Sequence, residues 1–105
     1  MIWTSGTWTV RAGAEERFVA AWQEMARWSL AAFPGSGPAW LLQDRNRPTV
    51  FVSLGAWPSE ATVAAWRAAD GFRQRVAAME ELLETFEART LDQVVSLVPG
   101  ATPAG

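Results

Sequence analysis

The chain has 105 residues, enough for one domain, and its eleven acids outweigh nine arginines for a net charge of −2 at pH 7. That balance argues against a nucleic-acid partner, which normally needs a basic surface to neutralise phosphates. Cysteine, histidine, lysine and tyrosine do not occur, so the sequence excludes disulfides, thiolate nucleophiles, imidazole metal ligands and Schiff-base amines. No apolar run is long enough to cross a membrane and no signal peptide is recognisable, so we expect a cytoplasmic location.

The first two elements are predicted from side-chain periodicity. Residues 2–10 alternate in the manner of a strand, which places Trp3 and Trp8 on opposite faces. Residues 14–32 carry large apolar side chains at steps of three and four, which predicts a helix of about five turns. The run PGSGP at 34–38 ends that helix.

Two further strands are predicted at 39–45 and 49–57, and their short connection implies an antiparallel hairpin. A second helical region then begins with Ser59 as its N-cap. It pauses at Asp70, which is expected to cap a second segment that runs to about Leu83.

The last predicted element is a long strand over residues 84–98, whose polar middle suggests an edge or a bulge. The order strand, helix, strand, strand, helix, strand favours an α+β fold of the ferredoxin-like type. In this fold a four-stranded antiparallel sheet carries both helices on one face. We expect the domain to span residues 1–98 and residues 99–105 to form a flexible tail.

The second face of such a sheet is predicted to be apolar as well. In the strand at 49–57, Val52 and Leu54 alternate with Phe51, and the preceding strand places Trp40 and Leu42 on one face. Monomeric proteins rarely expose an apolar patch of this kind. The pattern therefore predicts a homodimer that pairs sheet against sheet about a two-fold axis.

Three segments carry a family resemblance: GTWTVRAGAEERFVAAWQEMARW (6–28), FVSLGAWPSEATVAAWRAADGFRQRV (51–76) and FEARTLDQVV (86–95). With them the chain resembles the antibiotic biosynthesis monooxygenase family of dimeric ferredoxin-like α/β-barrel proteins. The group includes cofactor-free oxygenases of polyketide phenols, haem-degrading enzymes, polyketide cyclases and members without an assigned activity. The resemblance implies a homodimer with a pocket in each subunit between the sheet and the helices.

Trp66 matches a tryptophan that the family places in its pocket. The haem-degrading branch also needs a histidine in the following helix, and this chain offers Phe72 and Arg73 there, so haem ligation by histidine is excluded. The candidate catalytic residues are Trp66, Arg73 as an anion stabiliser and Asp70 as a base. The candidate substrate-binding residues are Phe18, Trp22, Phe51, Trp66, Phe72 and Met79.

Each of these residues also has a structural interpretation. Arg73 suits a solvated helix position paired with Asp70 or Glu80, and Asp70 suits an N-cap. Ser59 is interpreted as a cap and not as a nucleophile, because no base is present to activate it. Trp57 is interpreted as packing in the sheet or at the dimer contact, apart from Trp66.

The sequence leaves three functions open. The first is a cofactor-independent monooxygenase that acts on a small aromatic or polyketide-type metabolite, with no metal and no cofactor. The second is a non-catalytic dimeric protein that binds a small aromatic ligand. The third is a polyketide cyclase-like enzyme, for which only Asp or Glu would be available as acid or base.

Overall fold

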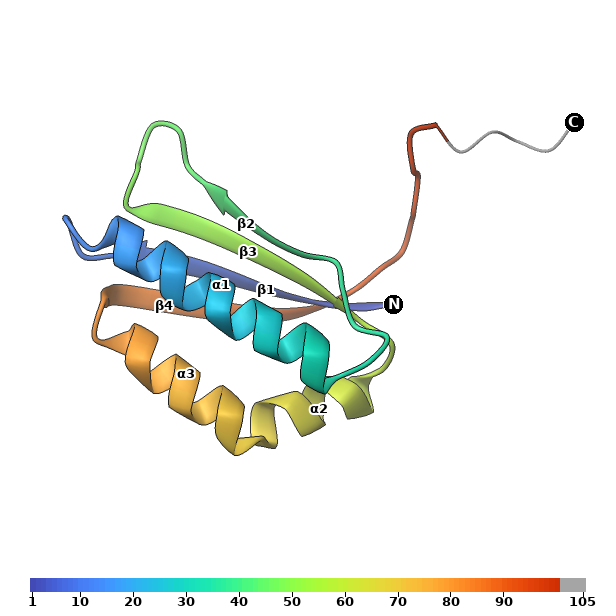
Figure 1. Ribbon diagram of the computed structural model, residues 1–105. Coiled ribbons are helices and arrows are strands. Elements are labelled where there is room, and N and C mark those ends of the chain that lie inside the picture. The colour runs from blue at the N-terminus through green and yellow to red at the C-terminus, as the bar shows by residue number, and fades with distance from the viewer. Residues whose placement is uncertain (101–105) are drawn as a thin grey trace, which may run out of the picture.

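Four antiparallel strands form one sheet in the order β2-β3-β1-β4, and three helices lie on one of its faces (Figure 1). The computed structural model describes residues 1–100, and no helix within them is long and apolar enough to cross a membrane. The elements are β1 (Ile2–Val10), α1 (Glu15–Ala32), β2 (Ala39–Gln43), β3 (Val50–Trp57), α2 (Glu60–Ala68), α3 (Asp70–Glu80) and β4 (Leu83–Asp92). The predicted α+β ferredoxin-like fold is therefore confirmed.

The sequence explains where helix α1 begins and ends and which of its sides is buried. Glu15 and Glu16 lie in the first turn, where the helix dipole favours negative charge. Phe18 and Met25 are buried on one side of the helix. After the helix ends, Gly35 and Gly37 adopt φ angles of +89° and +108°, a region that favours glycine.

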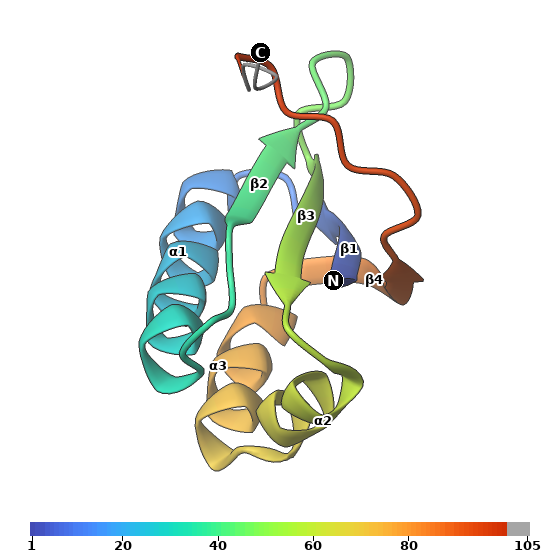
Figure 2. The same ribbon diagram turned by 90° about the vertical axis from the view of Figure 1, so that its right-hand side faces the viewer.

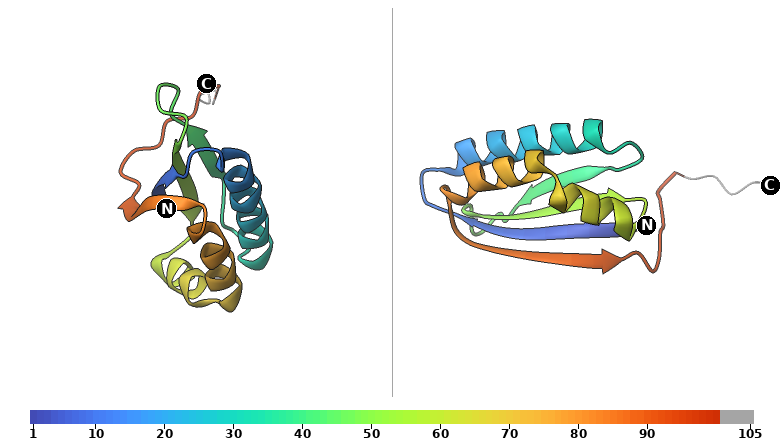
Figure 3. Two further views of the ribbon diagram at one scale, coloured as in Figure 1. Left: turned by 90° about the vertical axis from the view of Figure 1, so that its left-hand side faces the viewer. Right: turned by 90° about the horizontal axis from the view of Figure 1, so that it is seen from below.

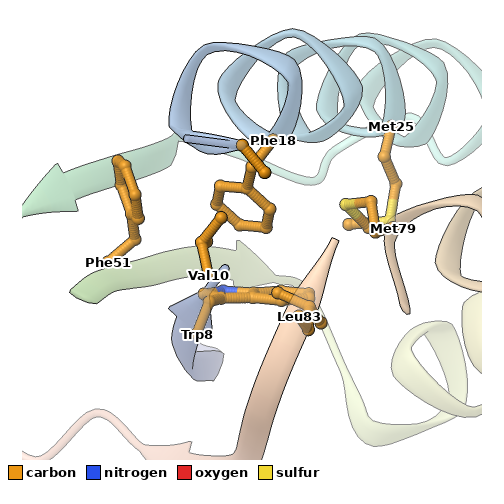
Figure 4. Close-up of a cluster of buried hydrophobic side chains, with 8 residues drawn as sticks. Trp8, Val10, Phe18, Met25, Phe51, Met79 and Leu83 are labelled. Carbon is orange, nitrogen blue, oxygen red and sulfur yellow. The ribbon is translucent and has the colours of Figure 1, made fainter. Parts of the chain in front are cut away.

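The core lies between α1 and the helix-facing side of the sheet. In the β1–β3 register Trp8 stands opposite Phe51, and both side chains point toward the helices. The ring of Phe18 lies 5.3 Å from that of Trp8 and 5.1 Å from that of Phe51, measured between centroids. Figure 4 shows these rings packed together with Met25 and Met79, so large side chains of β1, α1, β3 and α3 form one cluster.

The second helical region is divided as predicted, but its second cap is not the predicted one. Ser59 caps α2, since its hydroxyl accepts the backbone N–H of Thr62 at 3.2 Å. Ala69, in an extended conformation, separates α2 from α3, and Asp70 is the first residue of α3 with no capping bond. The N-cap interpretation of Asp70 is therefore wrong. Gly71 serves helix packing, because a Cβ there would collide with the indole of Trp28.

Strand β4 is shorter than the predicted strand over residues 84–98. Its last pair joins Asp92 to Ile2, and the N–H of Gln93 then bonds to the carbonyl of Met1, where β1 begins. Beyond that point no partner strand remains, so residues 93–98 leave the sheet, as the right-hand view of Figure 3 shows. Of the expected tail at 99–105, residues 101–105 lie outside the described residues.

The two faces of the sheet differ in what covers them. Figure 2 shows α1, α2 and α3 on one side and no helix on the other. On the uncovered side Trp3 and Trp40 stack with ring centroids 5.7 Å apart. Trp40 and Leu42 remain 50% and 55% exposed. This face, which also carries Val52 and Leu54, is called the open face below, and its apolar character agrees with the sequence pattern.

Candidate functional site

An apolar cavity of about 120 Å³ lies between the covered face of the sheet and the three helices. Its wall takes residues from all four strands on the sheet side and from α1, α2 and α3 on the helix side. An apolar cavity of about 150 Å³ is known to bind benzene, so this one can enclose about one aromatic ring. Its aromatic lining residues are Trp8, Trp22, Trp57, Trp66, Phe72 and Phe86.

Trp66 is held in the wall by contacts on three sides. It lies one helical turn after buried Val63, on the inward side of α2. Its ring lies 4.5 Å from the rings of both Trp57 and Phe72. Its indole N–H donates to the hydroxyl of Ser29 on α1 at 2.9 Å. The ring is therefore fixed in orientation and still borders the cavity.

Trp57 and Trp66 form one continuous wall, contrary to the interpretation that kept them apart. Trp57 is buried at the end of β3 on the same side as Phe51, and that side faces the helices and not the open face. Its indole N–H donates to the hydroxyl of Thr4 at 3.0 Å. The interpretation failed because strand alternation groups residues by face without showing which face the helices cover.

Arg67 is the single charged residue in the cavity wall within residues 1–100. Its Nη2 donates to Thr90 Oγ1 at 3.0 Å, so the guanidinium reaches from α2 to β4. Arg73, Arg75 and Arg89 form ion pairs with carboxylates, whereas Arg67, which is exposed, forms none among the described side chains, like the five remaining arginines. A cation without a counterion at an apolar cavity is suited to an anionic group on a ligand.

The structure brings three of the predicted substrate-binding residues into the wall and leaves three outside it. Trp22, Trp66 and Phe72 line the cavity. Phe18, Phe51 and Met79 instead belong to the buried core. Phe18 and Met79 are fully buried, so a ligand in the cavity would not touch them without rearrangement.

The structure does not bring Arg73 and Asp70 to the cavity. Their side chains are 68% and 90% exposed on α3, and they face each other at 3.9 Å. The break at Ala69 separates Trp66 on α2 from Arg73 on α3. The structural interpretation of Arg73, a solvated partner of Asp70, describes its observed position.

Sequence reasoning missed several polar groups of the wall. Arg67 directly follows Trp66, and this position next to a predicted pocket residue was the only feature of the sequence that pointed to it. Ser29 continues the buried stripe of α1 four residues after Met25, and Ser53 sits between Phe51 and Gly55 on β3. A small hydroxyl residue at an otherwise apolar inward position was the signal that could have found both.

The wall contains no evident metal or haem ligand. Within the described part of the chain no group of three acidic, histidine or cysteine residues could hold a metal ion. The polar side-chain groups of the cavity are hydroxyls, indole N–H groups and the Arg67 guanidinium. Such a wall can bind a flat apolar molecule and stabilise an anion on it, but it offers no carboxylate or imidazole for proton transfer.

The fold and the cavity define a ferredoxin-like α+β domain with an aromatic-lined pocket between its sheet and its helices. Residues 1–78 match the family model described as antibiotic biosynthesis monooxygenase. The match spans more than half of the chain, so the protein belongs to that family. No curated protein matches it.

Solved structures of this fold resemble the chain at low sequence identity. SnoaB, a cofactor-independent oxygenase from Streptomyces nogalater, superposes with a TM-score of 0.81 at 23% identity, covering 91% of this chain and 95% of that one. A putative antibiotic biosynthesis monooxygenase from Caulobacter crescentus gives 0.82 at 21% identity, with 90% of both chains covered. A third from Nitrosomonas europaea gives 0.79 at 20%, with 90% and 100% covered. At these identities the likeness shows the fold alone.

Proposed function

We propose that the protein is a cofactor-independent monooxygenase that oxidises a small aromatic or polyketide-type metabolite in the cavity. One observation supports this most strongly: an aromatic wall borders Arg67, a cation without a carboxylate partner among the described residues. Family membership and the resemblance to a cofactor-independent oxygenase agree with the proposal. The enclosed volume suits one ring, so additional rings would extend toward the exposed part of the wall at Phe86.

The reaction needs no reductant when the substrate itself supplies the electrons. A ring CH₂ group that becomes a carbonyl gives four electrons and two hydrogens to O₂, so one oxygen atom enters the product and the other leaves as water. The deprotonated substrate passes one electron to O₂, and the two radicals then join through a C–O bond. The peroxide takes up a proton and loses water to leave the carbonyl. The protein must therefore bind the ring, exclude water and stabilise the anions.

Arg67 and Trp66 divide these tasks. The positive charge of Arg67 lowers the pKa of a phenol or enol beside it and stabilises the peroxide anion. Trp66 is oriented by its contacts with Trp57, Phe72 and Ser29, and it positions the flat ring. The substrate proton leaves to solvent, because no carboxylate lines the cavity among the described residues.

Oxygen uptake tests the proposal. Purified protein free of metal and flavin is given anthrone and naphthols, and O₂ consumption and ketone or quinone formation are measured together. Arg67→Gln is expected to lower kcat/KM about 10–100-fold, since it removes a positioned charge. Arg27→Gln is the matched control, because Arg27 is exposed on α1 outside the cavity wall. Equal turnover by wild type and Arg67→Gln would contradict the role of Arg67.

A non-catalytic binding protein is the second candidate. The lack of a carboxylate in the wall favours it, because an oxygenase that acts on a weakly acidic substrate benefits from a base. Tryptophan fluorescence quenched by ligands, without O₂ uptake across the panel, would favour this candidate. A polyketide cyclase-like activity is the weakest of the three, since among residues 1–100 no Asp or Glu lines the cavity as acid or base.

We also propose that the open face pairs two copies of the chain into a homodimer. Trp40 and Leu42 are half exposed beside the stacked ring of Trp3, which is unusual for a surface that meets water alone. The segment after β4 supports a second copy as partner, because Val94 and Leu97 are 90% and 89% exposed. Light scattering that gives the chain mass of 11.5 kDa at micromolar concentration would contradict a dimer.

The proposed domain covers residues 1–98, and the family match at 1–78 accounts for most of it. Its last strand, β4, supplies Phe86 and Ala88 to the cavity wall, beyond the matched segment. Truncation after residue 98 is expected to leave the unfolding free energy unchanged, whereas truncation after residue 80 would remove β4 and unfold the protein.

A further inference from the structure

Two hydroxyl groups in the cavity wall carry a proton that no described protein group accepts. Ser53 Oγ accepts the indole N–H of Trp8 at 2.9 Å, and Thr4 Oγ1 accepts the indole N–H of Trp57 at 3.0 Å. A hydroxyl has one proton to donate in addition to its acceptor lone pairs. Among residues 1–100 neither hydroxyl donates to a protein acceptor. Because buried polar groups are normally paired, a free proton in a cavity wall favours an acceptor on a ligand.

Two other hydroxyls of the same wall, those of Ser29 and Ser36, differ in this respect. Ser29 accepts the indole N–H of Trp66 and donates its own proton to the carbonyl of Met25 at 2.7 Å. Ser36 donates to the carbonyl of Phe33. The hydroxyl protons of Thr4 and Ser53, which have no protein acceptor, therefore lie on the sheet side of the cavity. On the helix side, the Ser29 hydroxyl already donates its proton within α1.

The sheet register places the two hydroxyls side by side on the covered face. Ser53 pairs with Gly6 and Thr4 pairs with Gly55, so the hydroxyl residues are diagonal neighbours, whose Cβ atoms lie somewhat less than about 7–8 Å apart. A Cβ on Gly6 would come within 2.9 Å of Ser53 Oγ and 2.7 Å of Trp8 Nε1. The ring of Phe86 would also lie within 3.0 Å of that Cβ, so only glycine fits beside the bond between Trp8 and Ser53.

The indole donors also strengthen the hydroxyls as donors. An N–H that donates to a hydroxyl oxygen polarises its O–H bond, and hydrogen bonds in a chain reinforce one another in a low-dielectric site. The wall has no carboxylate and no side-chain amide within the described residues, so it contributes side-chain donors without matching strong acceptors. A ligand that complements it carries an acceptor oxygen on its ring system.

We propose that Thr4 and Ser53 form a two-hydroxyl donor site that binds an acceptor oxygen of the aromatic ligand and selects ligands that carry one. The oxygen is that of a carbonyl, an enolate or a phenolate, and its hydrogen bonds orient the ring in the cavity that Trp66 also lines. The proposal rests on the proposed binding of an aromatic molecule in the cavity. It assigns the sheet side of the cavity to recognition of a ligand oxygen, and Arg67 to stabilisation of negative charge.

The test compares two probes that each have one ring and differ in one oxygen. Acetophenone has a carbonyl acceptor and no donor, and ethylbenzene has the same ring with a hydrocarbon substituent. Thr4→Val and Ser53→Ala each remove one hydroxyl, whereas Thr4→Ser and Ser53→Thr keep it. Binding is measured by calorimetry, and the infrared C=O stretch of bound acetophenone reports hydrogen bonds to the carbonyl independently of protein stability.

The hydroxyl-free variants are expected to bind acetophenone about 2–10-fold more weakly each, the usual effect of one neutral hydrogen bond. Their C=O stretch should move to higher wavenumber than in wild type. Ethylbenzene affinity should stay within twofold, and the hydroxyl-keeping variants should retain acetophenone affinity.

Three results would overturn the proposal. An unchanged C=O stretch in both hydroxyl-free variants would show that the two hydroxyls do not bind the carbonyl, without contradicting the aromatic cavity. An equal loss of affinity for acetophenone and ethylbenzene would show the same. Failure of both probes to bind wild type would overturn the aromatic site and the donor site together. The first two results leave oxygen uptake by the wild-type protein intact, so they are distinct from a failure of the proposed function.

Discussion

The two faces of the sheet carry similar amounts of tryptophan, but only on the covered face do the tryptophan rings border a cavity and donate to hydroxyls in its wall. On the covered face Trp8 and Trp57 donate their indole N–H groups to Ser53 and Thr4 beside the cavity. On the open face Trp3 and Trp40 stack on each other at the surface, and the N–H of Trp3 donates to an exposed glutamine, Gln93. The same residue type therefore builds a pocket on one face and a flat contact surface on the other.

This difference follows from what lies above each face. Large core side chains near Phe18 fill the space between the helices and the covered face. Elsewhere between these two layers the residues are smaller, and the cavity remains. No helix rests on the open face, so its apolar side chains lie in one layer that a second copy can match. Composition alone cannot separate these two outcomes, whereas the position of the helices does.

Loss of the core ring of Phe18 should have the largest effect on the covered face. Phe18→Ala is expected to lower the free energy of unfolding by about 3–5 kcal/mol, because the ring is fully buried between Trp8 and Phe51. Urea unfolding followed by tryptophan fluorescence measures the loss. Val19→Ala, on the exposed side of the same helix, is the control and should change stability by less than about 1 kcal/mol.

A charge on the open face should break the dimer without harming the pocket. Leu42→Asp is expected to raise the dimer Kd at least about 100-fold, since it places an unpaired carboxylate in an apolar interface. Sedimentation equilibrium measures the change, and Ala20→Asp on the outer side of α1 is the matched control. A Leu42→Asp protein that remains dimeric would show that the open face is not the contact.

The bond between Ser29 and Trp66 offers a smaller test of the pocket wall. Ser29→Ala leaves the Trp66 N–H without its acceptor and is expected to cost about 1–3 kcal/mol of stability. In the double variant with Trp66→Phe that donor is absent, so the additional cost of Ser29→Ala should nearly disappear. A double-mutant cycle in urea measures the coupling, and strictly additive effects would contradict it.

The smallest effect is expected at the exposed pair on α3. Arg73→Gln and Asp70→Asn should each change ligand affinity and any turnover by less than about twofold, because both side chains are exposed away from the cavity wall. Titration of the same aromatic ligand against both variants checks this. A tenfold loss in either would return the anion-binding role from Arg67 to α3.

Much of the fold could be predicted from local patterns. Alternation in residues 2–10 and three-four steps in residues 14–32 depend on neighbours along the chain, and both were correct. The Ser59 cap is equally local. The length of β4 was overestimated because it depends on where β1 begins, and residues 93–98 therefore have no partner.

The candidate site was predicted less completely, because tertiary geometry determines it. Trp66 was identified through the family resemblance and lines the cavity. Arg73 was chosen as the anion stabiliser without its tertiary position being known, and the extended backbone at Ala69 places it on α3, away from the cavity wall. The contact between Trp57 and Trp66 joins residues of different elements, which periodicity within either element does not report.

The most direct test of the account uses the seven tryptophans as reporters of ligand position. Each indole N–H gives its own cross-peak in a ¹H–¹⁵N correlation spectrum, and single Trp→Phe variants assign them. Titration with 1-naphthol should shift the peaks of Trp8, Trp57 and Trp66, which border the cavity, and leave those of Trp3 and Trp40 unchanged. Shifts confined to Trp3 and Trp40 would contradict the account, because they would place the aromatic ligand on the open face.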